Sequence, residues 1–254
     1  MKQKRQKTWT PYAMVLPAFA VMMLVVVLPI INTILQSFKT ADGTFTMANY
    51  QYFFTSKEAF QSLIFTAIEA FSTMILAIIF SFLLALYLRF SKSKISKLIG
   101  RLYLLPRFIP GIVAVYAVIK GIILCNLWFN IPFSAMLLSA ALSAVADSYV
   151  ESARDAGCSY WKIFQKIIWP LVYKEVIVAA TFILMGQIGA FTIPYLTGPN
   201  NPKMLGILLY QQVNTYLDYQ KAAALSVLMF LLCLGGAVVY IKSNMKEEVW
   251  EKGR

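Results

Sequence analysis

Long apolar runs separated by short charged segments dominate the sequence. Each run has about 20 residues, the length that an α-helix needs to cross ~30 Å of hydrocarbon. Hydrophobic residues make up 59% of the 254 residues and charged residues only 13%, whereas a soluble domain carries about 25% charged residues. We therefore expect an all-α, polytopic membrane protein. Six runs predict its transmembrane helices, called spans here: residues 14–37, 62–88, 102–119, 121–146, 175–196 and 222–241.

The basic residues indicate how this transmembrane domain, residues 14–241, is oriented. If the N-terminal tail 1–13 lies inside the cell, most of the 23 Lys and Arg residues fall in that tail, in 89–101, in 147–174 and in the C-terminal tail 242–254. Inner loops of membrane proteins carry such an excess of Lys and Arg. The net charge of +12 therefore predicts topology rather than nucleic-acid binding. We expect both termini to be cytoplasmic and the chain to lie in a lipid bilayer.

The connection between the third and fourth spans is unusually short. Only Lys120 and Gly121 separate the two apolar runs, and two residues is the lower limit for joining antiparallel helices. The alternative is one long kinked helix from Leu102 to Ala146. That arrangement would give five crossings and an external C-terminal tail, against the charge bias, so we favour a tight turn.

The segment ESARDAGCSYWKIFQKIIWP, residues 151–170, is charged and amphipathic. Gly157 follows a short helical run and can end it with a positive φ, and Ser159 can then cap a second helix. In that helix the apolar residues Trp161, Phe164, Ile167 and Ile168 are expected to face the bundle. Pro170 would mark the start of the next span. The residues predict a helix–turn–helix between spans four and five; an ordinary surface loop is the alternative.

The spacing Glu151-x-Ala153-x-x-x-Gly157, followed by Ile167-x-Trp169-Pro170, resembles the "EAA" loop of the permease subunits of bacterial ABC importers. In that family the loop docks into a groove of an ATPase subunit. Family members typically have Ala where this chain has Ser152, and Leu where it has Trp169. The resemblance implies ATPase-coupling roles for Glu151, Ser152, Ala153, Asp155, Gly157, Trp161, Ile167 and Pro170.

The resemblance covers nearly the whole chain, including MANYQYFF before the second span and LYLLPRFIPGIVA at the start of the third. The stretch TIPYLTGPNNPKMLG looks more like the polyamine, iron and phosphonate branch than the sugar branch. The implied partners are an ATPase subunit, a second permease subunit of the same or a similar chain, and an extracytoplasmic substrate-binding protein. The sequence contains no GxxxxGK[ST] motif, so ATP is expected on a separate chain, with no enzyme activity or cofactor here.

The chain also departs from the family. Relatives commonly carry a few dozen residues between spans three and four, where this chain has almost none. Three interpretations of the short connection follow: an active short variant, an inactive, internally deleted copy, or a faulty gene sequence.

Four polar residues lie within the apolar runs: Glu69, Asn126, Asn130 and Gln187. A lone carboxylate at mid-membrane costs about 2.5–3.5 kcal/mol on insertion scales, so Glu69 should face the bundle or water. It is a candidate contact for a cationic substrate such as a polyamine, or else a packing residue paired with Thr66 or Thr73. The three amides are candidates for the substrate path, with interhelical hydrogen bonding as the alternative role.

Other classes of membrane protein find less support. A secondary transporter without an ATPase would need internal repeats or a chain of intramembrane charges. An intramembrane enzyme lacks a catalytic constellation, because the chain has no His and no paired acids in its spans. The three cysteines show no metal-ligand spacing, so we expect no metal site.

Overall fold

The computed structural model describes residues 10–111, 113, 121–198 and 202–251. In these residues the regular structure is helical, apart from an isolated bridge between Lys39 and Phe45. In chain order the elements are α1 (Thr10–Met22), η1 (Met23–Val27), α2 (Leu28–Ser37), α3 (Ala48–Thr55), α4 (Lys57–Phe90), α5 (Lys94–Leu102), α6 (Leu105–Phe108), α8 (Ile122–Ser143), α9 (Asp147–Asp155), α10 (Tyr160–Ile163), η2 (Phe164–Ile168), α11 (Trp169–Ile188), α12 (Thr192–Thr197), α13 (Leu205–Asn214) and α14 (Tyr219–Glu251).

Within the described residues, five helical stretches are long and apolar enough to cross a membrane. They are Met14–Ser37, Lys57–Phe90, Ile122–Ser143, Tyr160–Ile188 and Tyr219–Lys242. Their apolar side chains are widely exposed, and the most apolar window of the first stretch has no buried residue. This exposure suits a chain whose outer surface meets lipid. The stretches overlap the first, second, fourth, fifth and sixth predicted spans.

The described part of the third predicted span is not one continuous helix. Helix α5 ends at Leu102, α6 has only four residues, and Ile109 is extended with ψ 121°. Because a proline disfavours helical geometry in the residue before it, Pro110 accounts for the break at Ile109. Residues 112 and 114–120 lie outside the described part, so the span itself stays a prediction. The alternative of one helix from Leu102 to Ala146 is wrong.

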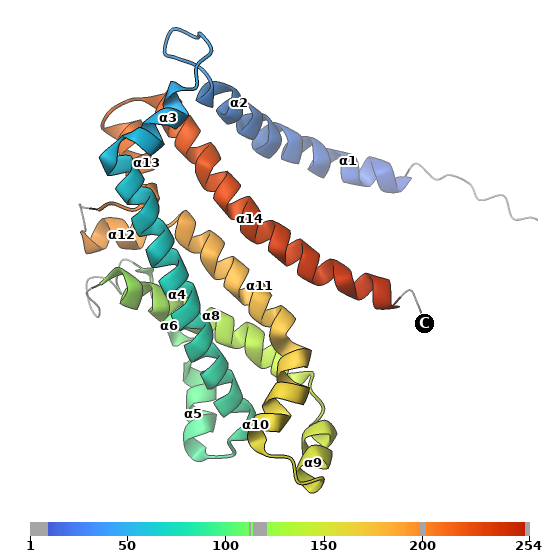
Figure 1. Ribbon diagram of the computed structural model, residues 1–254. Helices are drawn as coiled ribbons and strands as arrows, with labels where there is room; N and C mark the ends of the chain where they lie inside the picture. Colours follow the sequence, from blue (N-terminus) through green and yellow to red (C-terminus); the bar gives the residue numbers. More distant parts are fainter. Residues whose placement is uncertain (1–9, 112, 114–120, 199–201, 252–254) are drawn as a thin grey trace, which may run out of the picture.

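Helix α4 forms the long axis of the molecule (Figure 1). It packs against α8 and α11, while α11 also packs against α14, and α14 is the main neighbour of α2. At one end of α4 lie α3 and α13; at the other lie α5, α9 and α10. The charged segment around α9 therefore projects from the end opposite to α3 and α13.

The buried apolar core consists of three clusters along this axis. One joins α3, α4, α13 and α14 around Phe53 and Leu205. A middle cluster contains Ala77, Leu127 and Ile183. The third joins the end of α4 to α8, α10, η2 and α11 around Phe82, Leu142, Ile163, Ile168 and Val172. The last cluster fixes the charged segment to the membrane helices.

Two helices contain a π-helical turn, and each turn lies just before a proline. The backbone N–H of Leu28 bonds to Met23 O next to Pro29, and that of Trp169 bonds to Phe164 O next to Pro170. Proline lacks an N–H and its ring clashes with the carbonyl four residues earlier. A π turn allows the helix to pass through such a site without ending. Residues 160–188 consequently form one long helix, so the fifth membrane helix begins earlier than expected.

The segment between the fifth and sixth predicted spans contains a helix, α13. Its Leu205, Ile207, Leu208 and Gln212 are buried. Gly206 allows the close approach, because a Cβ there would lie 2.3 Å from Ala190 O. The fifth membrane helix ends at Ile188, before the predicted residue 196, and short helix α12 follows.

Candidate coupling site and substrate path

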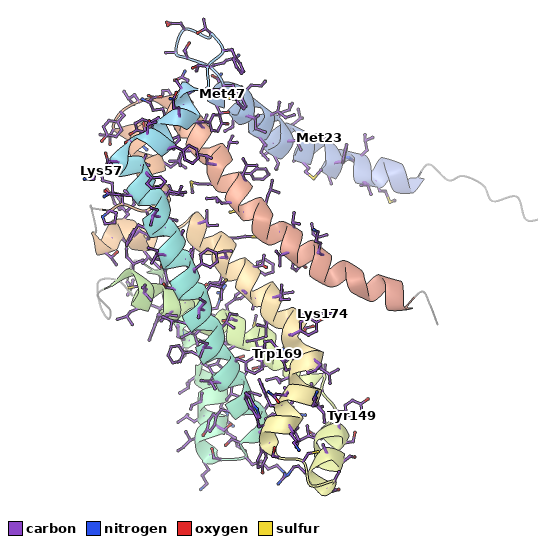
Figure 2. All side chains as sticks on the ribbon, in the orientation of Figure 1. Met23, Met47, Lys57, Tyr149, Trp169 and Lys174 are labelled. Atoms are coloured by element: carbon purple, nitrogen blue, oxygen red, sulfur yellow. The ribbon has the colours of Figure 1, made fainter. Side chains whose placement is uncertain are left out.

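We define the coupling block as residues 147–170, comprising α9, the turn after it, α10, η2 and the first residues of α11. It begins at Asp147, on the N-terminal turn of α9, and is exposed at the end of the molecule (Figure 2, where Tyr149 and Trp169 mark its two sides). The helix–turn–helix expected between spans four and five is present here.

The turn of the coupling block has the geometry predicted from Gly157. This residue has φ +75°. Its N–H donates to Arg154 O at 2.9 Å, and the N–H of Cys158 donates to Ala153 O at 3.0 Å. This pair of bonds is the Schellman arrangement that ends helices at a left-handed glycine. Ser159 Oγ then accepts a hydrogen bond from the N–H of Lys162, as expected of an N-cap.

One face prediction is wrong. Trp161 is 64% exposed, whereas Ile163 and Ile168 are buried; Phe164 and Ile167 are half-buried, as expected for residues near the bundle. In a regular helix Trp161 and Ile168, seven residues apart, would share a face. The π turn inserts one residue and rotates the following part of the helix, so Ile163 and Ile168, five residues apart, point the same way instead.

The coupling block presents a polar and aromatic surface. Glu151, Ser152, Asp155 and Pro170 are exposed, whereas Ala153 is half-buried and packs on the core. Trp161 stacks on Phe164 with ring centroids 5.4 Å apart. With Trp169 and Lys166 these rings line a hollow of about 510 Å³. The exposed surface is available to a partner protein, while the opposite side is held in the core.

Arg89, at the last turn of α4, joins the coupling block to the membrane helices. Its Nε donates to Leu142 O at 3.3 Å and its Nη2 donates to Val145 O at 3.1 Å. The same Nη2 makes an ion pair with Asp147, at the start of α9. Arg89 therefore binds carbonyls at the end of α8, where helical carbonyls lack partners, and the first turn of α9. No local feature of the sequence indicates this role.

Glu69 and Asn126 lie together between α4 and α8. Asn126 Nδ2 donates to Glu69 Oε1 at 2.6 Å, and Thr73 Oγ1 donates to the same oxygen at 2.8 Å. Of the two expected partners, Thr73 is present. Thr66 instead accepts a bond from the backbone N–H of Leu205 at 2.9 Å.

The other two candidate polar residues are not bonded to Glu69. Asn130 Nδ2 donates to Asn126 O at 2.7 Å, one turn along α8. Gln187 is buried on α11, and its Oε1 has no hydrogen-bond partner in the described part of the chain. Ser81 and Ser134, which the sequence did not single out, form a further hydrogen bond between α4 and α8.

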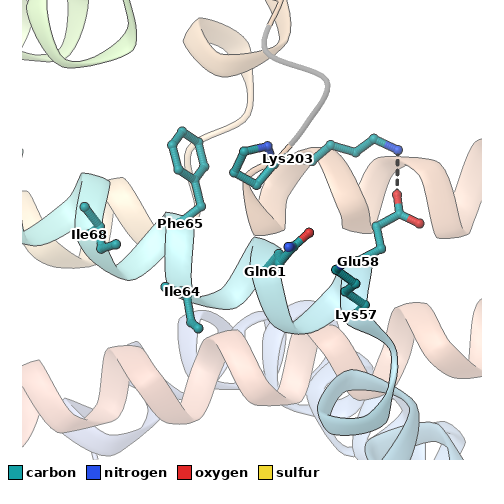
Figure 3. A pocket seen from close by; sticks show the side chains of 8 residues that line it. Lys57, Glu58, Gln61, Ile64, Phe65, Ile68 and Lys203 are labelled. Carbon is teal, nitrogen blue, oxygen red and sulfur yellow. Dashed lines mark hydrogen bonds and ion pairs between the residues drawn. The ribbon is translucent and has the colours of Figure 1, made fainter.

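A cavity of about 850 Å³ lies at the α3 end of α4 (Figure 3). Lys203 and Glu58 lie in the wall of this cavity. Lys203 Nζ donates to Glu58 Oε1 at 2.7 Å and to Gln211 Oε1 at 2.9 Å. Gln61, Phe65 and Ile68 are also in its lining. The cavity is thus polar at one end and apolar towards the middle of α4.

The family of binding-protein-dependent transport system inner membrane components matches residues 58–243. The chain belongs to this family. As a permease of an ABC importer it is a transport subunit in a membrane, and ATP hydrolysis belongs to a separate chain in this family.

Individual permeases of known families are similar to this chain over different parts of their length. A probable ABC transporter permease of Pyrococcus horikoshii is 24% identical over 93% of this chain and 99% of its own length. The thiamine transport permease of Escherichia coli is 28% identical over 46% of this chain and 22% of its length. The trehalose/maltose permease of Thermococcus litoralis is 29% identical over 48% and 42%, respectively. These relatives do not favour a polyamine branch over a sugar branch.

A solved structure has the same fold. A chain of a bacterial ABC transporter involved in the import of alginate matches with a TM-score of 0.75 and 17% identity, over 96% of both chains. At this identity the likeness concerns the fold alone.

Proposed function

We propose that the coupling block is the surface that receives an ATPase subunit, and that it transmits the movement of that ATPase to the membrane helices. The observation that carries this proposal is the two-sided environment of the block. Its charged and aromatic surface around Glu151, Asp155 and Trp161 is exposed, while Ile163 and Ile168 are anchored in the core cluster with Phe82 and Leu142.

The transmission follows from these contacts. A push on α9 acts directly on Asp147 and Arg89, and hence on the ends of α4 and α8. Both are continuous helices, and Glu69 and Asn126 lie further along them. Movement of the two helices relative to each other changes the space around these polar residues, which alternating access requires.

The proposed assembly contains two permease subunits, either two copies or two similar chains, together with ATPase subunits and an extracytoplasmic binding protein. A solved structure with a similar fold is that of a bacterial alginate ABC transporter in complex with an alginate pentasaccharide-bound periplasmic protein. We place both termini in the cytoplasm on the charge bias of the loops. The transported molecule is a small polar solute, for which a polyamine is one candidate and a sugar the other.

This chain is shorter than one of its relatives in the family. The alignment with the Pyrococcus relative spans 287 positions, more than the 254 residues of this chain, so that relative has residues that this chain lacks. We propose that they belong between the third and fourth spans. An inactive copy is distinguished from an active one by substrate-stimulated ATP hydrolysis.

The proposed coupling is tested with Gly157→Asp and Glu151→Lys. The first places a side chain at φ +75°, and the second reverses an exposed charge on α9. Both variants should insert into the membrane yet lose copurification of the ATPase subunit. Lys97→Glu, an exposed charge reversal on α5, is the matched control and should retain the ATPase. Full copurification in both coupling variants would contradict the proposal.

A further inference from the structure

One buried carboxylate oxygen, on Glu69, has no hydrogen-bond partner among the residues that the structure describes. Glu69 is 2% exposed. Its Oε1 accepts two hydrogen bonds, from Asn126 and Thr73, whereas no group in the described residues donates to the buried Oε2. A buried carboxylate oxygen without a donor is unfavourable. An oxygen of this kind, beside one that is fully bonded, marks a place for a missing cationic or donating group.

Glu69 lines a cavity of about 520 Å³. Phe65 and Ile68 contribute to it from α4, Ile122 to Leu124 from α8, and the end of α12 completes the wall. Of the described residues in this lining, Glu69 is the single charged one. The cavity therefore combines apolar walls, including an aromatic ring, with one acidic group.

This cavity and the outer cavity next to Lys203 have Phe65 and Ile68 in common. In the outer cavity the charge of Glu58 is already paired with Lys203. A cation that reaches the shared wall therefore finds its unpaired carboxylate at Glu69 and not at Glu58. The two cavities lie in series along α4, between the α3 end and the middle of the helix.

We propose that Glu69 binds a protonated amine of the transported solute through Oε2, and that the solute carries this amine on a short hydrocarbon chain. An ammonium group supplies the missing donor and balances the charge, and the aromatic face of Phe65 favours a nearby cation. The hydrocarbon chain fits the apolar walls. This inference rests on the proposed function, and it makes the substrate class a cationic amine rather than a neutral sugar.

Other occupants fit the cavity less well. A calcium ion takes six to eight oxygen ligands and magnesium about six, whereas no cluster of three acidic, His or Cys residues that could hold a metal occurs in the described residues. A neutral polyol could donate one hydrogen bond but would leave the carboxylate charge unbalanced and its hydroxyls against apolar walls.

The test uses the full chain, purified with its ATPase in lipid nanodiscs, and two probes of similar length: 1,4-diaminobutane and the uncharged 1,4-butanediol. The diamine should raise the melting temperature of the complex, and the diol should not. Glu69→Gln keeps an oxygen for Asn126 and Thr73 but removes the charge. It should weaken diamine binding by about tenfold or more, as expected for one charge-assisted bond.

Two control variants separate binding from packing. Thr73→Val removes one hydrogen bond to Oε1, so it should lower the melting temperature without probe but keep the diamine shift. Glu58→Gln should leave the diamine shift unchanged. Equal shifts with diamine and diol in the wild type, or a full diamine shift in Glu69→Gln, would overturn the amine site. If Glu69→Gln does not insert, the diamine and the diol are compared on the wild type and on Glu58→Gln. Equal shifts with the two probes would still overturn the amine site.

The same preparation separates this inference from the proposed function. An ATPase that copurifies normally with a permease that does not respond to the diamine overturns the amine site alone. A permease that binds the diamine but recruits no ATPase overturns the coupling proposal alone.

Discussion

Arg89 and Asp147 form an ion pair that joins the last turn of α4 to the first turn of α9. Because Arg89 also binds the carbonyls of Leu142 and Val145, this one side chain holds three helix ends together. The contact is located where a force on the coupling block would enter the bundle. It gives α4, which also carries Glu69, a direct connection to the coupling block.

Removing Arg89 should therefore impair coupling more than removing Asp147. Arg89→Gln loses the ion pair and weakens the bonds to both carbonyls, at a cost of about 1–2 kcal/mol. Asp147→Asn affects only the ion pair, and Asp147 is 66% exposed, so water screens it and the cost is about 0.5 kcal/mol. Thermal unfolding and substrate-stimulated ATP hydrolysis measure the two effects.

Arg89→Gln should keep the ATPase bound, because the exposed face of α9 is unchanged. It should nevertheless lower the stimulation of ATP hydrolysis by substrate. Lys92→Gln, an exposed residue near Arg89, is the control. If Arg89→Gln behaves like this control, the three-way contact has no role in coupling.

Substitutions of an exposed and of a buried apolar residue in α10, the second helix of the coupling block, should affect ATPase binding and stability differently. Trp161→Ala removes exposed aromatic surface and should weaken ATPase binding with little change in the melting temperature. Ile163→Ala leaves a hole in the buried cluster and should destabilise the chain by about 2–5 kcal/mol. Thermal unfolding and ATPase copurification on the same samples separate the two results; a strongly destabilised Trp161→Ala would mean that this ring is part of the core.

The contact between α13 and the end of α11 should not tolerate a methyl group at Gly206. Its Cβ would lie 2.3 Å from Ala190 O, a backbone atom that cannot easily move. Gly206→Ala should therefore cost about 1–3 kcal/mol. Gly235 in α14 has open space around its Cβ position, so Gly235→Ala should be neutral or stabilising by up to about 1 kcal/mol. Equal melting temperatures for the two variants would argue against the tight packing of α13.

The proposed orientation can be tested with the native Cys158, which is exposed on the coupling block, whereas Cys125 is buried. In intact cells a membrane-impermeant maleimide should not label the chain, and it should label Cys158 once the membrane is permeabilised. Asp42→Cys, on the exposed loop near α3, should be labelled in intact cells. Labelling of Cys158 in intact cells would show that the orientation is the opposite of the proposed one.

Local sequence signals predicted the coupling turn well. Gly157 and Ser159 act through bonds to residues a few positions away, so their roles are visible in the order of residues. The same applies to Thr73, which lies one helical turn from Glu69 and bonds to it. The stretch MANYQYFF, which resembles a segment of the family before its second span, forms helix α3.

Longer-range features could not be predicted. Arg89 looked like an ordinary topology-setting charge, because its partners are more than 50 residues away in the chain. The π turn before Pro170 places Trp161 and Ile168 on different faces of the helix. A single extra residue in the turn rotates the residues after it relative to those before it. Helix α13 was not predicted, because its apolar residues do not form a single stripe. Its buried residues pack on both α4 and α14.

The most direct test of the central claim is a cross-link between the coupling block and the ATPase. Ser152→Cys places a thiol on the exposed face of α9, and Asp42→Cys places one at the opposite end. With a bismaleimide in native membranes, after Cys158 has been replaced by Ser in both variants, Ser152→Cys should give a permease–ATPase adduct whose yield changes when ATP is added. Asp42→Cys should give none. A Ser152→Cys chain that forms no adduct, while the ATPase still copurifies, would show that the ATPase binds elsewhere and would contradict the account.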